Sequence, residues 1–304
     1  MLAALITTLL WSASVTFGHR SAKILGGTEA NFWRLAIATM LLAIWAHTIG
    51  QGLSGASFLL FFLSGVIGIG MGDVALFQAL PRLGSRLSIL LVQCLSAPFA
   101  ALTEYLWLGT KLTLFQMICG GVILTGVSIA LSPGKHLNLT RRQLTVGVIF
   151  GTIAALGNAI GAVLSRKGFA VAEAAGQDMD GATTAYQRLI GGLLFGGICL
   201  LVVKRNQFNI HKLLPPAEKW KIAWKWVLLN AIAGQTLGVS FYQLALKTAP
   251  TGIVLAITAL TPLMVIPFAS YFEKEKPQPK SIFGGVLAVF GVLGLIYSKY
   301  VFEK

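Results

Sequence analysis

One aspartate stands inside a long apolar stretch of the sequence, where an ionisable side chain is expensive to bury. The stretch Gly70–Leu80 reads GMGDVALFQAL and contains Asp73. A carboxylate in such a place has three uses: it can activate water together with a second aspartate, it can line the path of a transported solute, or it can form a structural ion pair. The rest of the chain has to distinguish among these uses.

The first use is hydrolysis inside a membrane. Gly70–Asp73 reads G-M-G-D, the G-x-G-D pattern around one catalytic aspartate of intramembrane aspartyl proteases. That chemistry needs two aspartates in the membrane, which share a proton and act as a dyad. The other two aspartates of the chain, Asp178 and Asp180, lie in a polar connection, which argues against a protease. No nucleophile elbow, phosphate loop or metal-binding motif occurs either, so we expect no enzyme, no cofactor and no metal site.

The composition is that of a membrane protein. The chain is 56% hydrophobic and 11% charged, with a mean hydropathy of +0.77, whereas soluble domains carry about 25% charged residues. The net charge is +14, but the basic residues fall mostly between apolar runs, where membrane topology explains them. We therefore expect a lipid bilayer and a small-molecule substrate as partners, and no nucleic acid.

The apolar runs predict an all-α polytopic protein with about ten transmembrane helices. The first run begins at Met1 without a basic segment or an A-x-A-like cleavage site, so we expect a first span rather than a signal peptide. We expect a multi-pass protein of the cell (inner) membrane, as a monomer or homodimer. The predicted helices are 2–18, 29–48, 57–80, 85–107, 112–131, 144–166, 183–203, 224–246, 250–272 and 281–299.

The two halves of the chain resemble each other. The matching segments are 97–98 with 261–262, 119–122 with 283–286, 77–78 with 242–243, and 33–35 with 187–189. We interpret residues 1–138 and 139–304 as two diverged copies of a five-helix unit. A second copy that follows an odd number of spans sits upside down, and inverted repeats around a central site are typical of secondary transporters.

These motifs, in this order, resemble the EamA-type transporters of the drug/metabolite transporter superfamily. The residues that carry the resemblance are Trp11 in the first helix, Arg34 early in the second, the turns Ala97-Pro98-Phe99 and Thr261-Pro262-Leu263, and the Gly-Gly-Val runs 120–122 and 284–286. The resemblance implies export or exchange of small metabolites across a cell membrane. The family often has a glutamate after the Leu-Gly pair that ends helix 4, but here Thr110 follows Leu108-Gly109; in the second half, Glu273 and Glu275 occupy that region.

Helix depth suggests two acid–arginine pairs. Asp73 lies about 10 Å from the end of its helix, and Arg34 lies at a similar depth from the same membrane face. Near the opposite face, Glu104 and Arg188 are placed in the same way. The arginines can instead anchor helix ends by snorkelling. A carboxyl group in a low-dielectric site can also exchange a proton, so Asp73 and Glu104 are candidates for proton coupling.

A substrate site at the midplane needs polar side chains on glycine-loosened or proline-broken helices. Pro98 and Pro262 each remove a helical hydrogen bond. The candidate substrate-binding residues are Trp11, Gln78, Gln93, Asn158, Gln235, Tyr242, Gln243 and Thr261. Hydrogen bonding between helices is the other use of such side chains.

This set favours a neutral or zwitterionic solute, such as an amino acid or a related compound. We expect alternating access, by facilitated or proton-coupled exchange. A lipid-linked or phosphorylated metabolite is the alternative cargo of the same superfamily.

The orientation is left open by two conflicting signals. Most of the lysines and arginines between helices lie in the connections after the first, third, fifth, seventh and ninth predicted helices. The positive-inside rule then places both termini outside. The family resemblance implies that both termini are in the cytoplasm.

Overall fold

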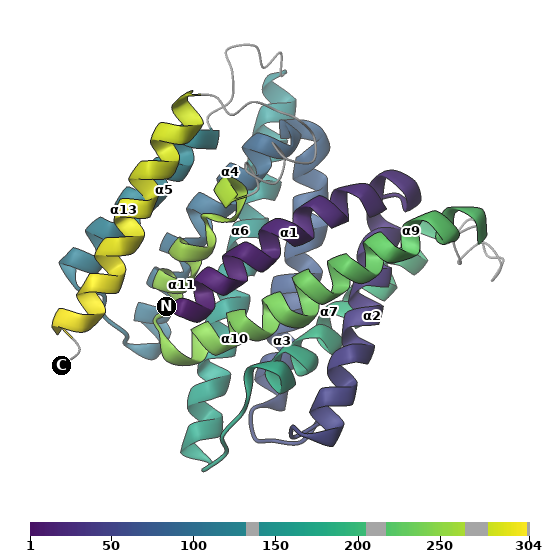
Figure 1. Cartoon of the computed structure of the whole chain (residues 1–304), viewed down its shortest axis with the longest axis horizontal. Helices are drawn as coiled ribbons and strands as arrows, with labels where there is room; N and C mark the ends of the chain where they lie inside the picture. The colour runs from purple at the N-terminus through teal and green to yellow at the C-terminus, as the bar shows by residue number, and fades with distance from the viewer. Residues whose placement is uncertain (132–139, 205–216, 265–278, 303–304) are drawn as a thin grey trace.

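A computed structural model describes residues 1–131, 140–204, 217–264 and 279–302, and every element within these ranges is helical (Figure 1). The first half contains α1 (Leu2–Leu25), α2 (Gly27–Thr48), α3 (Phe58–Gly65), the π-helical segment η1 (Val66–Met71), α4 (Gly72–Leu108) and α5 (Leu114–Leu131). The second half contains α6 (Arg141–Ala174), α7 (Gly181–Lys204), α9 (Ala217–Asn230), the π-helical segment η3 (Ala231–Gly238), α10 (Val239–Thr248), α11 (Thr251–Thr258) and α13 (Pro279–Phe302).

Several helices have the length and composition of membrane spans. Within the described residues, the long apolar stretches are Leu2–Leu25, Phe58–Leu76, Leu91–Leu108, Arg141–Ala174 and Gly181–Val202. Shorter apolar helices cover Leu114–Ala130, Thr251–Met264 and Ile282–Ser298. The prediction of an all-α polytopic membrane protein is therefore confirmed.

Several helix boundaries differ from the predictions: α1 ends at Leu25 instead of residue 18, and α9 begins at Ala217 instead of residue 224. The expected connection at 81–84 is helical, because α4 runs without a break from Gly72 to Leu108, although two separate apolar stretches flank that region. The helix expected to end at Arg166 continues to Ala174, through an alanine-rich run that ends before Gly176 with its φ of 68°. A turn at 259–260 interrupts the helix expected over 250–272, and its last residues, with Glu273 and Glu275, lie outside the described ranges.

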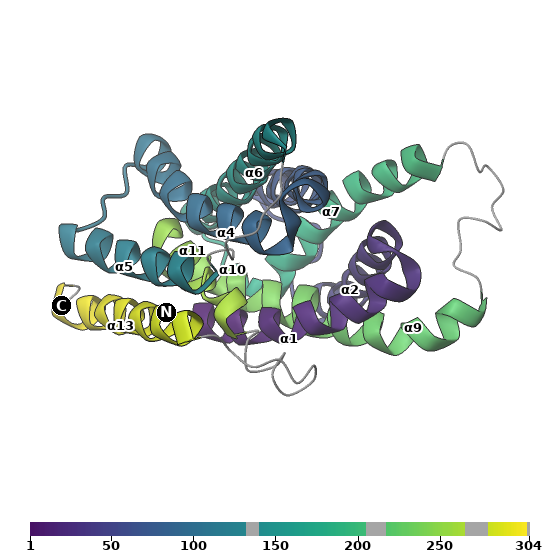
Figure 2. The ribbon, with the colours of Figure 1, turned by 90° about the horizontal axis from the view of Figure 1, so that it is seen from above.

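The helices pack as two copies related by a pseudo-twofold axis. The second helices of the two halves, α2 and α7, pack against each other, and so do the fifth helices, α5 and α13. The first helix of each half packs on the third helix of the other: α1 lies along α9–η3–α10, and α6 lies along α3–η1–α4. Figure 2 shows α5 and α13 side by side at one end of the molecule, with α2 toward the other. This is the arrangement of two inverted five-helix repeats.

Both third helices contain a π-helical segment at the same place. Val66 begins η1 eleven residues before Phe77, and Ala231 begins η3 eleven residues before Tyr242, in the two matched segments of the repeats. By the same offset, Gly238 stands where the first repeat has Asp73. π-helical turns are rare and occur frequently at functional sites. The two segments therefore mark the middle of the molecule as the place to look for a site.

The contact between α5 and α13 depends on two glycines. A Cβ atom added at Gly284 would overlap the carbonyl oxygen of Gly126, and one added at Gly126 would lie 2.6 Å from the backbone nitrogen of Ala288. Small residues allow such close approach between membrane helices. The neighbouring Gly285 has nothing within 4 Å of an added Cβ atom.

We therefore expect Gly284→Val to lower the free energy of unfolding by about 1–3 kcal/mol, because overpacking forces the two helices apart. Gly285→Val is the matched control and should change it by less than about 0.5 kcal/mol. Thermal unfolding of the purified protein in detergent measures both. Equal destabilisation by the two variants would contradict the glycine contact.

Candidate functional site

A charged cluster lies beside the first π-helical segment. Asp73 is in the first turn of α4, directly after η1, and its Oδ2 atom is 3.6 Å from Nη2 of Arg34 in α2. The two side chains are 27% and 22% exposed, so the ion pair is partly accessible. Arg34 also donates from Nε to Oδ1 of Asn31 at 2.8 Å. The 3.6 Å separation leaves the Asp73 carboxylate free to accept closer hydrogen bonds.

Arg188 of α7 also interacts electrostatically with Asp73. Its side chain is buried, and its guanidinium group lies over the ring of Tyr242, 5.4 Å from the ring centre. A Cβ atom added at Gly68 in η1 would lie 2.7 Å from Nη2 of Arg188, so any larger residue there would require the guanidinium group to shift. Asp73 therefore lies near two arginines that come from the second helices of the two repeats.

Two aromatic side chains of this centre, Trp11 and Tyr242, lie beside the second π-helical segment. Trp11 of α1 donates from Nε1 to the carbonyl oxygen of Gly234 in η3 at 3.1 Å, and its ring packs on Tyr242 with ring centres 5.1 Å apart. Thr7 donates to the carbonyl oxygen of Gly238 at 3.4 Å. The side chains of α1 thus satisfy carbonyl groups along η3 and hold Tyr242 under Arg188.

A groove of about 250 Å³ leads to Asp73. It runs between α2, α4 and α7, and its rim includes Asn31 near the start of α2 and Val202 near the end of α7. These helix ends lie at the same face as the α1–α2 junction, which we call the α1–α2 face. The residues that line the groove are Asn31, Phe32, Leu35, Ile69, Gly70, Asp73, Val74, Gln78, Gly192, Gly196, Cys199 and Val202.

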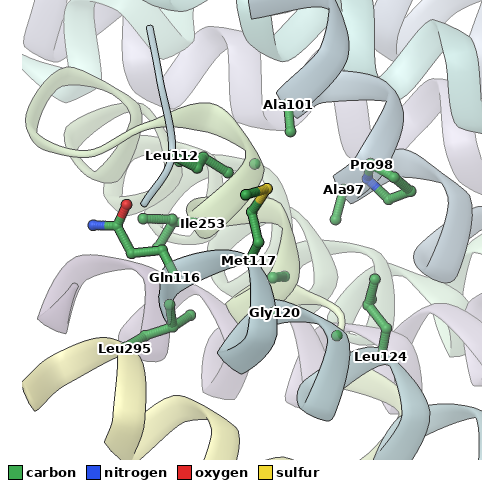
Figure 3. A pocket seen from close by; sticks show the side chains of 13 residues that line it. Ala97, Pro98, Ala101, Leu112, Gln116, Met117, Gly120, Leu124, Ile253 and Leu295 are labelled. Carbon is green, nitrogen blue, oxygen red and sulfur yellow. The ribbon is translucent and has the colours of Figure 1, made fainter. Parts of the chain in front are cut away.

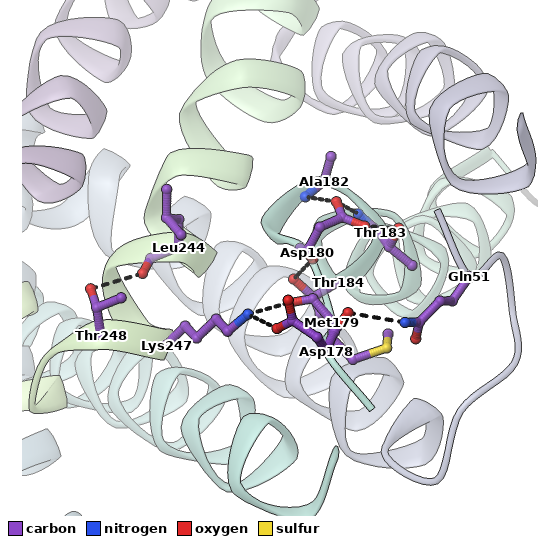
Figure 4. Close-up of polar contacts among 10 residues, drawn as sticks. All are labelled: Gln51, Asp178, Met179, Asp180, Ala182, Thr183, Thr184, Leu244, Lys247 and Thr248. Carbon is purple, nitrogen blue, oxygen red and sulfur yellow. Dashed lines mark hydrogen bonds and ion pairs between the residues drawn. The ribbon is translucent and has the colours of Figure 1, made fainter. Parts of the chain in front are cut away.

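At the opposite face, which we call the α2–α3 face, side chains from helices and connections join the segments beside a cavity of about 780 Å³ that is lined by residues including Trp107, Lys167, Glu173 and Thr248. Gln187 is fully buried and donates from Nε2 to the carbonyl oxygens of Gly52 and Ser54, at 3.0 and 3.1 Å. Gln51 donates to the carbonyl oxygen of Asp178 at 3.0 Å, and Lys247 at the end of α10 pairs with the Asp178 carboxylate (Figure 4). The connections 49–57 and 175–180 are therefore tied to each other and to α10.

An ion pair at this face reinforces the corner between α10 and α11. Arg166 pairs with Glu104 and donates from Nη1 to the carbonyl oxygens of Leu246 and Ala249, at 2.9 and 2.7 Å. Oε2 of Glu104 accepts the backbone N–H of Thr251 at 2.6 Å. The arginine thus stabilises the negative end of α10 and the glutamate stabilises the positive end of α11.

This pairing corrects the expected pair of Glu104 with Arg188. Arg166 is not an expected partner of Glu104, because the predicted helix ends at Arg166, whereas α6 continues for eight more residues. The alanine-rich run after Lys167 was the signal that the helix continues. Arg188 is consequently left at the centre of the molecule and close to Asp73.

Two of the other predicted polar residues, Gln243 and Asn158, connect helices. Gln243 donates to Ser165 at 3.1 Å, and Asn158 donates to Ser96 at 3.3 Å. Thr261 donates to the carbonyl oxygen of Thr258, the group that Pro262 leaves without its helical partner. Gln78 accepts from Arg82 at the exposed rim of the groove, Gln93 is half-buried on α4, and Oε1 of Gln235 is buried without a hydrogen bond to any described residue.

Pro98 does not interrupt its helix and faces an apolar pocket instead of a polar one. The pocket has a volume of about 330 Å³ and lies between α4, α5, α11 and α13 (Figure 3). Gln116 is the one polar side chain among its lining residues, and its Oε1 atom accepts the backbone N–H of Thr113. This pocket does not suit a polar solute, so the charged centre remains the candidate site.

Comparison with known proteins gives the family. A family model described as the EamA-like transporter family matches residues 1–132 and again 145–297. The chain belongs to the EamA-like transporter family. The search of curated proteins finds no match. Among solved structures, one described as "Crystal structure of protein" superposes on this EamA-like chain with a TM-score of 0.76 and 14% identity, covering 100% of this chain and 98% of that chain; it supports the fold alone.

The Arg34–Asp73 ion pair predicts how the stabilities of the two single variants and the double variant should differ. Asp73→Asn leaves two guanidinium groups without their shared carboxylate, so we expect a clear loss of stability. Adding Arg34→Gln to Asp73→Asn removes one of those charges and should recover part of the loss, with a coupling free energy of about 0.5–3 kcal/mol. Thermal unfolding of both single variants and the double variant measures it. Strict additivity of the two single effects would argue against the pair.

The Glu104–Arg166 pair predicts a contrast between neighbouring residues. Arg166→Gln should cost about 3–5 kcal/mol of unfolding free energy, because it leaves the buried Glu104 carboxylate unpaired. Lys167→Gln, one residue along the same helix, removes an equal charge and should cost less than about 0.5 kcal/mol. Chemical or thermal unfolding in detergent compares the two. Similar losses would show that Arg166 acts only through the net charge of this face.

Proposed function

We propose that this EamA-like protein is a secondary transporter that exports small polar metabolites, amino acids or related compounds, across the cell (inner) membrane by alternating access. One observation carries the proposal: a groove leads from the α1–α2 face to a charged centre between two inverted repeats. The cavity at the α2–α3 face is not lined by Asp73 or Arg188, and beside it Gln187 and Gln51 hydrogen-bond the connections together. A site that can be reached from one side only is what an alternating-access transporter presents in each of its two states.

The residues of this chain suggest how the two states differ. In the opposite state, the groove at Gln78 and Val202 closes and the contacts of Gln187 and Lys247 at the α2–α3 face break. Gln187 is the stronger of these two contacts, because it is fully buried, whereas Asp178, the partner of Lys247, is 92% exposed and such pairs contribute about 0–1 kcal/mol. Opening of the α2–α3 face therefore has to replace the hydrogen bonds of Gln187.

Asp73 is the better candidate for proton coupling. Its carboxylate lines the groove, and its contact with Arg34 is at 3.6 Å. Glu104 is buried, paired with Arg166 and hydrogen-bonded to the backbone of Thr251. A proton that enters through the groove can therefore reach Asp73 without disturbing the Glu104 contacts that stabilise the corner between α10 and α11.

Transport also fits the surroundings of Asp73 better than hydrolysis does. The charged groups close to it are Arg34 and Arg188, and the other two aspartates, Asp178 and Asp180, lie in the connection at the opposite face. An aspartate dyad needs a second carboxylate within hydrogen-bonding reach.

Efflux from proteoliposomes tests the proposal. Vesicles that hold the purified protein are loaded with a mixed pool of amino acids and nucleobases, with and without a pH gradient. We expect the wild type to release a subset of the pool and Asp73→Asn to release it at least tenfold more slowly. Glu173→Gln removes an exposed carboxylate at the α2–α3 face and is the matched control, with an unchanged rate.

The outcome of this assay separates the roles of Asp73. If Asp73→Asn loses only the response to the pH gradient, Asp73 is the proton site. If it loses all release but unfolds at the wild-type temperature, Asp73 belongs to the substrate path. If the wild type releases none of the pool, the assignment to small polar metabolites is wrong.

A further inference from the structure

Arg188 is a buried cation with unused hydrogen-bonding capacity. Its side chain is 3% exposed, and neither Nε nor Nη1 makes a hydrogen bond to any residue in the described part of the chain. The hydroxyl group of Tyr242 is also buried, and its interaction with the neighbouring Arg188 guanidinium lacks the geometry of a full hydrogen bond. Buried donors of this kind are costly unless a partner is supplied.

The charges around Arg188 do not balance. Arg34 and Arg188 bring two positive charges, and Asp73 brings one negative charge that lies within range of both. Among the described residues this centre therefore carries one excess positive charge. A carboxylate group of a ligand would pair with this positive charge.

Arg188 does not itself line the groove, but it lies one helical turn before a lining residue of α7. Gly192 and Gly196 line the groove and follow Arg188 at four-residue intervals along α7, so all three positions share one face of the helix. On the other side of the groove, Gly70 and Asp73 are lining residues. Gly68, two residues before Gly70, lies beside the guanidinium group of Arg188. A solute that moves inward past Asp73 along this face would therefore approach the buried side chain of Arg188.

We propose that Arg188 and the Tyr242 hydroxyl bind the carboxylate of the transported solute. This assignment rests on the proposed transport function and makes it narrower: the cargo is a small metabolite that carries a single carboxylate. A guanidinium group binds a carboxylate through two parallel N–H donors, and a tyrosine hydroxyl adds a third donor. Asp73, which lines the groove beside Arg188, is placed to accept the ammonium group of an amino acid.

The same observations disfavour a phosphate ester. A phosphate group with two negative charges calls for more than one free cation, but Arg34 is already engaged with Asp73 and Asn31. The groove volume of about 250 Å³ is also below the roughly 300–1,000 Å³ of pockets for drug-sized ligands. A small metabolite with one carboxylate needs only one free cation and is consistent with the small groove volume.

The experiment compares L-amino acids with their C-terminal amides, which keep the side chain and the ammonium group but lack the carboxylate. The purified full-length protein is titrated with each compound and its thermal unfolding is followed, because a ligand that binds the folded state raises the unfolding temperature. We expect a subset of the amino acids to stabilise the wild type and the matching amides to bind at least tenfold more weakly. Equal stabilisation by acids and amides would overturn the assignment.

Variants locate the binding to Arg188. Arg188→Gln should weaken the apparent binding of the stabilising amino acids at least tenfold, and Arg188→Lys, which keeps the charge but not the paired donors, should weaken it less. Arg141→Gln removes an exposed arginine at the start of α6 and is the matched control, with wild-type binding. Wild-type binding by Arg188→Gln would overturn the assignment. If Arg188→Gln does not fold, the comparison of acids with amides on the wild type still decides.

The two proposals fail in different ways. If neither amino acids nor amides stabilise the wild type but nucleobases leave the proteoliposomes, the carboxylate site is wrong and polar transport stands. If amino acids stabilise the protein through Arg188 but nothing leaves the vesicles, the site stands and the transport function is wrong.

Discussion

The structure depends on the need of every backbone polar group to find a partner inside the protein, because the bilayer core offers no water. The π-helical and broken segments of the third and fourth helices of the second repeat expose carbonyl groups, and α1 supplies side chains to them. Trp11 donates to Gly234, and Thr8 and Ser12 donate to the carbonyl oxygens of Ile257 and Thr261. Irregular backbone is therefore retained where another helix of the same chain stabilises it.

The helix ends at the α2–α3 face follow the same rule with charged groups. Arg166 takes the last carbonyls of α10, and Glu104 takes the first N–H of α11, while the two side chains pair with each other. Each charge is thus balanced by its partner and by the end of a helix. Arg188 differs, because no comparable set of acceptors surrounds it within the described residues, and this difference separates a structural arginine from a candidate binding residue.

Much of the architecture is predictable from the sequence, because apolar run length and repeated motifs are local properties. The helix count, the duplication and the proximity of Arg34 and Asp73 follow from spacing alone. The partner of Glu104 does not, since it depends on how far α6 continues beyond its apolar part. The π-helical segments are also hidden in the sequence, because they change the hydrogen-bond register without changing the hydrophobic pattern. The aromatic contact between Tyr242 and Arg188 joins two helices of the second repeat, and nothing in the spacing indicates it.

The repeats are alike in their arginines but not in their acids. Arg34 and Arg188 occupy matching segments, whereas Gly238 stands at the position of Asp73. If the two repeats were identical, exchanging their conformations would produce two states of equal energy. Because the first repeat has Asp73 where the second has Gly238, the two states would differ in how many of the arginine charges a carboxylate neutralises. Under the proposed alternating-access mechanism, the empty protein would therefore populate one state more than the other, and a bound carboxylate would shift that population.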